Sequence, residues 1–387
     1  EEISQILALA SKEKIVVVPR GAGSGMTGGA VPIEGGIVLV TTRMNQILEI
    51  DENNFWARVQ PGVVVGDLHQ FVESRGLFYP PDPASSAICT IGGNIGECAG
   101  GPRAVKYGVT RDYVLGLTAV LPSGEIIHTG VKTAKGVAGY DLTRLIVGSE
   151  GTLAIVTEIT LKLLPKPSAV QTMAVFFDTV HNAAKAVSGI MKHGVVPRCV
   201  EYLDDACLQL VKDHIQLEIL PEMRALLIIE VDGDLDTVQK DVAKIQSLCD
   251  HFGAIEHIVA NNPEDAQQLW AARKALSPIL YKIAPNKMNE DIVVPIDRIP
   301  DLVEETSQIQ ETFGLKVVSF GHAGDGNIHC NIMYQKSDPL QVQKAHAAIE
   351  RLFKSVLGMG GTITGEHGVG MTKREFFLLE VDTVQVE

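Results

Sequence analysis

The feature that most constrains this chain is a glycine-rich loop at residues 19–29, which follows directly on the apolar residues 15–18. Glycine has no Cβ, so the backbone N–H groups of such a loop can approach an anion closely and surround it. A dinucleotide diphosphate is a natural ligand for such a loop. Taken alone, however, a loop of this kind is a plain structural turn about as often as it is a binding site.

A Rossmann site for NAD is the first fold to consider for this loop. That fold needs a helix directly after the loop and an acidic residue about 20 residues further on, which binds the ribose. Residues 28–32 read Gly-Gly-Ala-Val-Pro and do not start a helix easily, and residues 41–43 read Thr-Thr-Arg. NAD on a Rossmann fold is therefore disfavoured.

Two further glycine-rich segments accompany the first loop, at residues 80–101 and 147–158. Three such segments in one small region predict a single extended ligand that is threaded between backbones. FAD has the required length and carries a diphosphate.

These three segments, in this order, closely resemble the FAD-binding domain of the vanillyl-alcohol-oxidase family, which is also called the PCMH type. The resemblance covers essentially the whole chain and is most specific to the branch of D-lactate dehydrogenases, D-2-hydroxyglutarate dehydrogenase and the flavin subunit of glycolate oxidase. It implies that the first loop binds the diphosphate, the second segment lines the isoalloxazine and ribityl groups, and the third meets the flavin through its backbone. The residues to which we assign FAD binding are Arg20, Gly21, Ala22, Gly23, Ser24, Gly25, Thr27, Pro81, Ser86, Thr90, Gly92, Gly93, Asn94, Gly100, Glu150, Gly151 and Ile155.

Ser24 bears on how the flavin is attached. Relatives with covalent FAD carry a histidine in the first loop, where this chain has Ser24. Serine cannot form the histidyl–flavin bond, so we predict that FAD is bound without a covalent link.

Residues 321–331 form a second segment of interest because they contain two histidines and an aspartate; they read Gly-His-Ala-Gly-Asp-Gly-Asn-Ile-His-Cys-Asn. The Gly-Asp-Gly triplet predicts a tight turn between His322 and His329. A strand after that turn would place His329 and Asn331 on the same side.

Residues 365–370 add Glu366 and His367 between flanking glycines. Two imidazoles and one carboxylate suit Zn²⁺ or Mn²⁺ with coordination positions left open for substrate. For a histidine pair alone, simple hydrogen bonding is the more common role. Non-haem iron oxygenases also use two histidines and a carboxylate, but the flavin segments already provide a redox centre, which favours a redox-inert ion.

The resemblance assigns a role to each of these residues. His367 matches the general base, and Arg273 in the Trp-x-x-Arg segment at 270–273 matches the residue that binds the substrate carboxylate. Arginine offers a planar fork that fits a carboxylate, although a solvated surface arginine is the alternative. Asn331 is expected to be a second substrate contact. The residues that match metal ligands are His322, His329 and Glu366.

The implied reaction is the oxidation of a small D-2-hydroxy acid. Chelation of the hydroxyl and one carboxylate oxygen by the metal would lower the hydroxyl pKa, His367 would remove the proton, and the hydride would pass to flavin N5. The 2-hydroxyglutarate enzymes place a lysine where this chain has Asn289, although Lys287 lies two residues earlier. We therefore expect D-lactate or glycolate rather than a dicarboxylate.

Two other functions fit parts of this pattern. A non-redox flavoenzyme similar to alkylglycerone-phosphate synthase would have no need of the metal set. A non-catalytic flavin-binding subunit of an electron-transfer complex would lack the pair at 366–367, which this chain contains.

The expected fold class is α+β with two domains: a PCMH-type FAD-binding domain at 1–165 and a substrate and metal domain at 166–387. The Pro-Lys-Pro triplet at 165–167 marks the boundary. An antiparallel sheet with helices is expected after it. Strands are expected at 15–18, 36–40, 57–59, 115–121, 152–162, 173–177 and 225–231, and helices at 65–75, 181–193, 237–252 and 265–280.

The composition and the cysteine spacing limit the classes of partner and the cell compartment that we expect for this chain. The net charge of −14 argues against nucleic acid, because phosphate binding needs an excess of basic residues. None of the six cysteines forms a C-x-x-C pair, which argues against an iron–sulfur site in this chain. If the enzyme passes electrons onward, the next carrier is another chain or a soluble acceptor: an iron–sulfur subunit, an electron-transferring flavoprotein, a quinone or a cytochrome. No apolar run approaches the roughly 20 residues of a membrane span. We expect a cytoplasmic protein, peripheral at the inner membrane if a partner holds it there, with homodimerisation left open and both chain ends incomplete.

Overall fold

The computed structural model describes residues 1–133, 135–212 and 219–386, and the chain divides into two compact units. The first, called unit 1 below, consists of Glu1–Arg103, Tyr107–Lys166 and Glu366–Glu375. The second, unit 2, consists of Ala104–Lys106, Pro167–Gly365 and Phe376–Glu387. The main break thus lies within the Pro-Lys-Pro triplet, between Lys166 and Pro167, and the short segment that carries Glu366 and His367 folds with unit 1.

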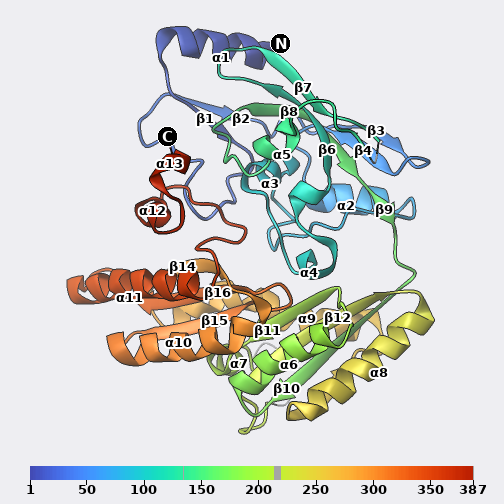
Figure 1. Ribbon diagram of the computed structural model, residues 1–387, viewed down its shortest axis with the longest axis vertical. Coiled ribbons are helices and arrows are strands. Elements are labelled where there is room, and N and C mark those ends of the chain that lie inside the picture. The colour runs from blue at the N-terminus through green and yellow to red at the C-terminus, as the bar shows by residue number, and fades with distance from the viewer. Residues whose placement is uncertain (134, 213–218, 387) are drawn as a thin grey trace. The chain divides into compact units, whose positions relative to one another are not determined.

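In the described part of unit 1, five strands form an antiparallel sheet in the order β3-β4-β8-β6-β7 (Figure 1). Two smaller pairs accompany it, the parallel pair β1-β2 and the antiparallel pair β5-β9. The strands are β1 (Val17–Arg20), β2 (Ile37–Val40), β3 (Ile47–Asp51), β4 (Trp56–Val59), β5 (Leu77–Phe78), β6 (Val114–Val120), β7 (Ile126–Gly130), β8 (Ile155–Lys162) and β9 (Leu164–Pro165).

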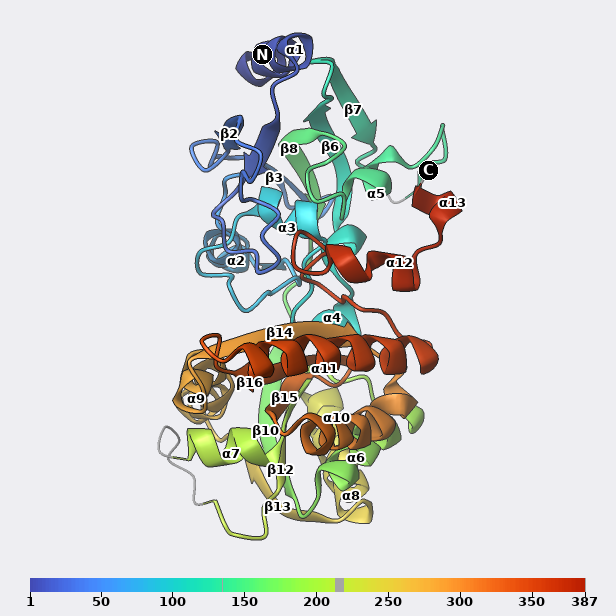
Figure 2. The same cartoon turned by 90° about the vertical axis from the view of Figure 1, so that its left-hand side faces the viewer.

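Apolar residues at helical spacing anchor helix α2 (Val65–Glu73), whose Val65, Leu68 and Val72 are all buried. Their side chains share one core with residues of β4, β6, β8 and α3 (Ile91–Glu97), and Figure 2 shows both helices with this sheet. The other helices that lie wholly or partly in unit 1 are α1 (Glu2–Glu13), α4 (Ala104–Tyr107) and α5 (Leu142–Ile146).

Helix α3 is an element that the sequence does not predict, because glycine in a helix interior costs about 1 kcal/mol relative to alanine. Tertiary packing overrides this preference. A Cβ on Gly92 would lie 2.6 Å from Pro61 Cβ, closer than real Cβ atoms come. Glycine therefore lets the helix pack against the chain at a distance that other residues would not permit.

In the described part of unit 2, seven strands form one sheet in the order β13-β10-β12-β11-β15-β16-β14, and every neighbouring pair is antiparallel. This confirms the predicted α+β class with an antiparallel second sheet. The strands are β10 (Ala169–Phe177), β11 (Cys199–Leu203), β12 (Ala225–Gly233), β13 (Ala254–Val259), β14 (Asn286–Val293), β15 (Lys316–His322) and β16 (Asn327–Tyr334).

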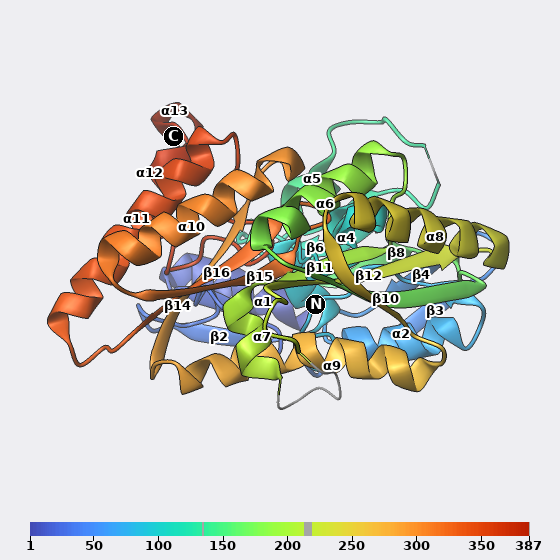
Figure 3. The same cartoon turned by 90° about the horizontal axis from the view of Figure 1, so that it is seen from below.

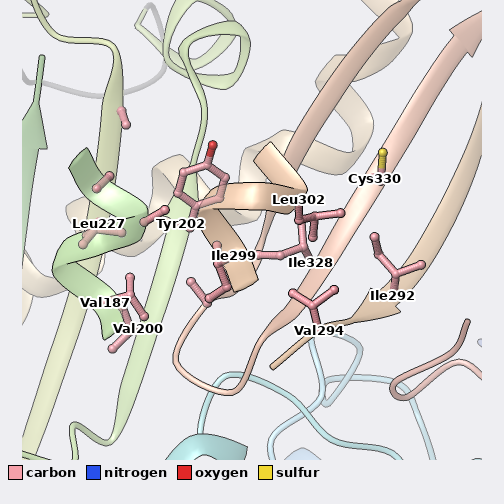
Figure 4. Packing of buried hydrophobic residues seen from close by; sticks show 14 of the residues in the cluster. Val187, Val200, Tyr202, Leu227, Ile292, Val294, Ile299, Leu302, Ile328 and Cys330 are labelled. Carbon is pink, nitrogen blue, oxygen red and sulfur yellow. The ribbon is translucent and has the colours of Figure 1, made fainter. Parts of the chain in front are cut away.

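Helices cover both faces of this sheet (Figure 3). Along β10, Met173 and Val175 belong to one core, and Ala174 and Phe176 belong to the other, as the alternation of side chains on a strand requires. Figure 4 shows part of the first core. Helices α6 (Val180–Lys192), α8 (Leu235–His251), α10 (Ile299–Phe313) and α11 (Pro339–Gly358) pack on the first face, and α7 (Asp205–Val211) and α9 (Pro263–Ile279) on the second. The chain continues into the short helices α12 (Phe377–Glu380) and α13 (Thr383–Val386).

The predicted elements appear with ends shifted by a few residues. Strands β1, β2, β4, β6, β8, β10 and β12 and helices α2, α6, α8 and α9 correspond to the expected ranges. All six cysteines are free thiols. Among the residues described, none of the helices combines the length and the apolar character that a membrane span requires.

Candidate active site

A cleft in unit 1 is lined by all three glycine-rich segments. Thr27, Pro81, Ser86 and Gly100 are absent from its described lining, although they were predicted to bind FAD. The predicted FAD-binding residues that do line it are Arg20, Gly21, Ala22, Gly23, Ser24, Gly25, Thr90, Gly92, Gly93, Asn94, Glu150, Gly151 and Ile155. Lining residues that the sequence did not single out include Thr41, Pro61, Ser85 and Glu97.

The glycines of the first loop are required by packing and by backbone conformation. A Cβ on Gly21 would lie 2.5 Å from Thr90 Oγ1 of the second segment. Gly23 has a φ of +73°, a backbone conformation that residues other than glycine rarely adopt. The first two segments can therefore approach each other only through these glycines, which leaves backbone rather than side chains along the cleft.

Buried polar groups along the cleft fit a polar ligand. Thr90 Oγ1 and Asn94 Nδ2 are buried, and neither has a hydrogen-bond partner among the described residues. Buried polar groups are nearly always paired in folded proteins. A ligand with many hydrogen-bonding atoms, as FAD has, is suited to these two groups, so the residues present fit this cofactor.

Glu366 and His367 line the same cleft as the glycine-rich segments. His367 Nε2 lies 3.9 Å from Glu366 Oε1. A Cβ on Gly100 would lie 2.9 Å from Glu366 Oε2, so the missing side chain at Gly100 makes room for this carboxylate. The predicted base thus belongs to the cleft that the predicted flavin segments form.

Glu97, at the end of α3, is a titratable residue that the sequence analysis missed. Burial raises the pKa of Glu97 to about 7, and the negative charge of Glu150 adds to the rise. Its Oε2 is buried without a hydrogen-bond partner in the described part of the chain. The available signal was one acidic residue in a stretch of glycine and small side chains.

This raised pKa predicts a pH-dependent stability. Unfolded Glu97 titrates near 4.5 and folded Glu97 near 7, so between these values the folded state binds the extra proton. Stability should therefore fall as pH rises from 4.5 to 7, with a slope of up to about 1.4 kcal/mol per pH unit. Thermal unfolding of protein freed of FAD should show this decline in the wild type and not in Glu97→Gln. Parallel pH profiles for the two proteins would contradict the assignment.

In unit 2, Glu201 on β11 joins two of the predicted site residues. Its carboxylate accepts a hydrogen bond from Arg273 Nε and contacts His322 Nδ1. Burial raises the pKa of Glu201, but the charges and hydrogen bonds of His322 and Arg273 outweigh it and lower the pKa to about 2. Because His322 uses Nδ1 toward Glu201, it would bind a metal ion through Nε2.

His329 on β16 faces a second buried carboxylate that was not predicted. Asp291 on β14 is its direct cross-strand neighbour, and Asp291 Oδ1 lies 3.8 Å from His329 Nδ1. Asp291 also accepts hydrogen bonds from Asn327 Nδ2 at 2.7 Å and from the Gly365 N–H at 3.0 Å. The ring centroids of His322 and His329 lie 5.3 Å apart. The sequence signal was the acidic pair Glu290-Asp291 directly before the apolar residues 292–294.

The two predicted substrate contacts lie in unit 2, where Asn331 is buried and Arg273 is largely buried. The Arg273 side chain on α9 is only 11% exposed and lies over the ring of Phe320, so it is not a solvated surface arginine. Asn331 is fully buried, and its Oδ1 accepts a hydrogen bond from Asn289 Nδ2 at 2.7 Å. Asn289 therefore sits beside the predicted substrate contact, where dicarboxylate enzymes of the family place a lysine.

The chain matches two family models. The model described as FAD binding domain matches residues 1–130, and the model described as FAD linked oxidases, C-terminal domain, matches residues 166–387. A protein named glycolate oxidase subunit GlcD from Bacillus subtilis (strain 168) is 44% identical over 98% of this chain and 81% of its own length. A protein named D-lactate dehydrogenase from Anaerostipes hadrus is 35% identical over 100% of this chain and 83% of its own.

Solved structures share the fold at low identity. A crystal structure of p-cresol methylhydroxylase with bound substrate has a TM-score of 0.81 at 17% identity. The match covers 100% of this chain and 82% of that chain. An alkyldihydroxyacetonephosphate synthase has a TM-score of 0.73 at 22% identity, and covers 94% and 71%. The two family models and the curated relatives show more than the fold: this chain belongs to the FAD-linked oxidases and is an FAD-dependent oxidoreductase.

Proposed function

We propose that this protein oxidises a small D-2-hydroxy acid, D-lactate or glycolate, to the corresponding 2-oxo acid. The observation that carries the proposal is that His367 lines the cleft formed by the flavin-binding segments. A base beside the flavin is what removal of a hydroxyl proton together with a C2 hydride requires. The names of the relatives, glycolate oxidase subunit and D-lactate dehydrogenase, support the same substrate class.

Different side chains would remove the proton and bind the substrate. Bound FAD would supply the acceptor for the hydride. His367 would take the hydroxyl proton on an imidazole nitrogen as general base. Arg273 would bind the substrate carboxylate, since guanidinium has five N–H donors and its Nε donates to Glu201. Asn331 would be a second contact.

We further propose that His322, His329 and Glu366 bind a divalent metal ion, Zn²⁺ or Mn²⁺. Metal-binding histidines usually have a carboxylate or carbonyl at the second ring nitrogen, which fixes the ring. His322 fits this pattern, because its Nδ1 contacts Glu201. His329 Nδ1 lies 3.8 Å from Asp291 Oδ1, which is beyond hydrogen-bond distance, so Asp291 brings a charge near this ring without fixing it. A bound ion would lower the pKa of the substrate hydroxyl.

Electrons must leave the flavin after each turnover, and we propose a separate acceptor protein, such as an iron–sulfur subunit or an electron-transferring flavoprotein. The six free cysteines are consistent with a reducing compartment, which we propose is the cytoplasm, with attachment to the inner membrane through that partner.

Anaerobic bleaching of the flavin by a panel of D- and L-2-hydroxy acids tests the proposed reaction. D-lactate or glycolate should reduce the flavin, and L-lactate and D-2-hydroxyglutarate should do so much more slowly. A flavin that none of these acids bleaches, but that dithionite reduces, would favour the non-redox or non-catalytic alternatives. Rapid bleaching by D-2-hydroxyglutarate would overturn the preference for a small monocarboxylate.

The attachment of FAD gives a further expected result. Ser24 lines the cleft at the position where relatives with covalent flavin carry histidine, and serine cannot form that bond. Acid precipitation of the yellow holoprotein should therefore release the flavin into the supernatant, as measured by its absorbance. Colour that stays with the protein pellet would refute a non-covalent cofactor.

A further inference from the structure

Glu150 has a backbone conformation that non-glycine residues rarely adopt. Its φ is +51°, in the left-handed region, and its N–H donates to the Gly96 carbonyl at 2.8 Å. Glycine would adopt this conformation without strain. Strained residues persist where the surrounding structure holds them and are frequent at functional sites, so the side chain of Glu150 needs an explanation.

Both carboxylate oxygens of Glu150 bind the backbone that follows His367. Oε1 accepts a hydrogen bond from the Val369 N–H at 2.7 Å, and Oε2 accepts one from the Gly370 N–H at 2.8 Å. Gly368 lies between His367 and these two donors, with φ of +76°. A Cβ on Gly368 would lie 2.9 Å from Glu150 Oε1, so the turn and the carboxylate fit together only with glycine there.

The first glycine-rich loop holds the same turn from a second point. The Thr27 hydroxyl donates to the His367 carbonyl at 3.0 Å. The Thr27 carbonyl accepts hydrogen bonds from the N–H groups of Met371 at 2.8 Å and Thr372 at 3.2 Å. Thr27 and Glu150 thus fix the backbone on both sides of Gly368, and each comes from a segment that lines the flavin cleft. All of these contacts lie within unit 1.

We propose that Glu150 is a positioning residue, whose carboxylate holds the Gly368–Gly370 turn and thereby orients the His367 imidazole in the flavin cleft. This inference rests on the proposed role of His367 as the base. It is separate from the flavin contact expected of Glu150, because that contact is assigned to the backbone, whereas the two side-chain oxygens accept hydrogen bonds from Val369 and Gly370. A carboxylate is well suited to accept two N–H donors.

Glu150→Gly and Glu150→Gln test this role in the holoprotein. The glycine variant removes the carboxylate while favouring the observed φ, so the fold should be retained. The glutamine variant keeps the shape but replaces one acceptor oxygen by an NH₂ group, which faces an N–H donor. Both should slow anaerobic flavin reduction about 10- to 100-fold, the usual effect of misplacing a catalytic group through a supporting residue. Their FAD dissociation constants should change far less than their reduction rates, because the flavin contact expected of Glu150 is made by its backbone, which both variants keep. Glu158→Gln is the matched control and should reduce at the wild-type rate. Glu158 lies eight residues after Glu150, and its partly exposed carboxylate pairs with Arg58 on β4.

A double-mutant cycle with His367→Ala separates positioning from a general structural effect. If Glu150 acts through His367, then Glu150→Gly should slow reduction little further in the His367→Ala background. Independent, multiplying losses, or a Glu150→Gly protein that reduces at the wild-type rate, would overturn the inference while leaving the proposed function in place. A His367→Ala protein with normal reduction would instead remove the proposed base, and the positioning role with it.

Discussion

Replacing His367 by alanine is expected to leave FAD binding intact and to slow flavin reduction by about 10²–10⁴-fold, the usual loss when a general base is removed. His367 lines the flavin cleft, and backbone contacts of its neighbours with Thr27 and Glu150 hold its turn. The alanine variant keeps all of these backbone hydrogen bonds. The loss should therefore fall on proton removal rather than on folding or cofactor retention.

Stopped-flow reduction under anaerobic conditions measures this effect directly. His128→Ala is a suitable control, because His128 is an exposed histidine on β7 of the same unit, and that variant should reduce at the wild-type rate. Dithionite should reduce the flavin of the His367→Ala protein completely, which shows that the cofactor is competent. Near-normal reduction of this variant by the substrate would remove His367 from the mechanism.

The cleft between the three glycine-rich segments was predictable because its sequence signals are local. Glycines directly after a strand indicate a backbone that packs closely or has an unusual conformation. In the fold, Gly21 packs closely against Thr90 and Gly23 has a positive φ. Helix α3 was not predictable for the opposite reason. Its glycines disfavour a helix locally, and the close packing of Gly92 against Pro61, which requires a glycine there, is a tertiary contact.

The carboxylates that support the candidate site could not be predicted, because their partners are distant in sequence. Glu201 and His322 are 121 residues apart and meet only through the pairing of β11 with β15. Asp291 faces His329 through the register of β14 and β16. A shift of one residue in that register would turn Asp291 to the other face of the sheet. Such pairs become visible only when strand order and register are known.

Removal of the proposed metal ion should abolish most of the activity. A bound divalent ion that polarises the substrate hydroxyl supplies several kcal/mol of transition-state stabilisation, so a loss of at least about 100-fold is expected on treatment with a chelator. Added Zn²⁺ or Mn²⁺ should restore flavin reduction by the substrate. FAD should stay bound to the treated protein, because Glu366 is the one proposed metal ligand in the described lining of the FAD cleft and the glycine-rich segments make up most of that lining.

Metal analysis of variants makes the chelator result specific. His329→Ala should lower the bound metal content together with activity, whereas His251→Ala, which removes an exposed histidine on α8 of the same unit, should lower neither.

Glu201→Gln tests the supporting carboxylate, since it leaves both imidazoles but weakens the contact that orients His322. Loss of such a supporting carboxylate typically weakens metal binding 10- to 100-fold, so this variant should need more added metal to reach its maximal rate. Full flavin reduction by protein shown to be free of metal would exclude a metal-assisted step and leave His367 as the sole means of activating the substrate hydroxyl.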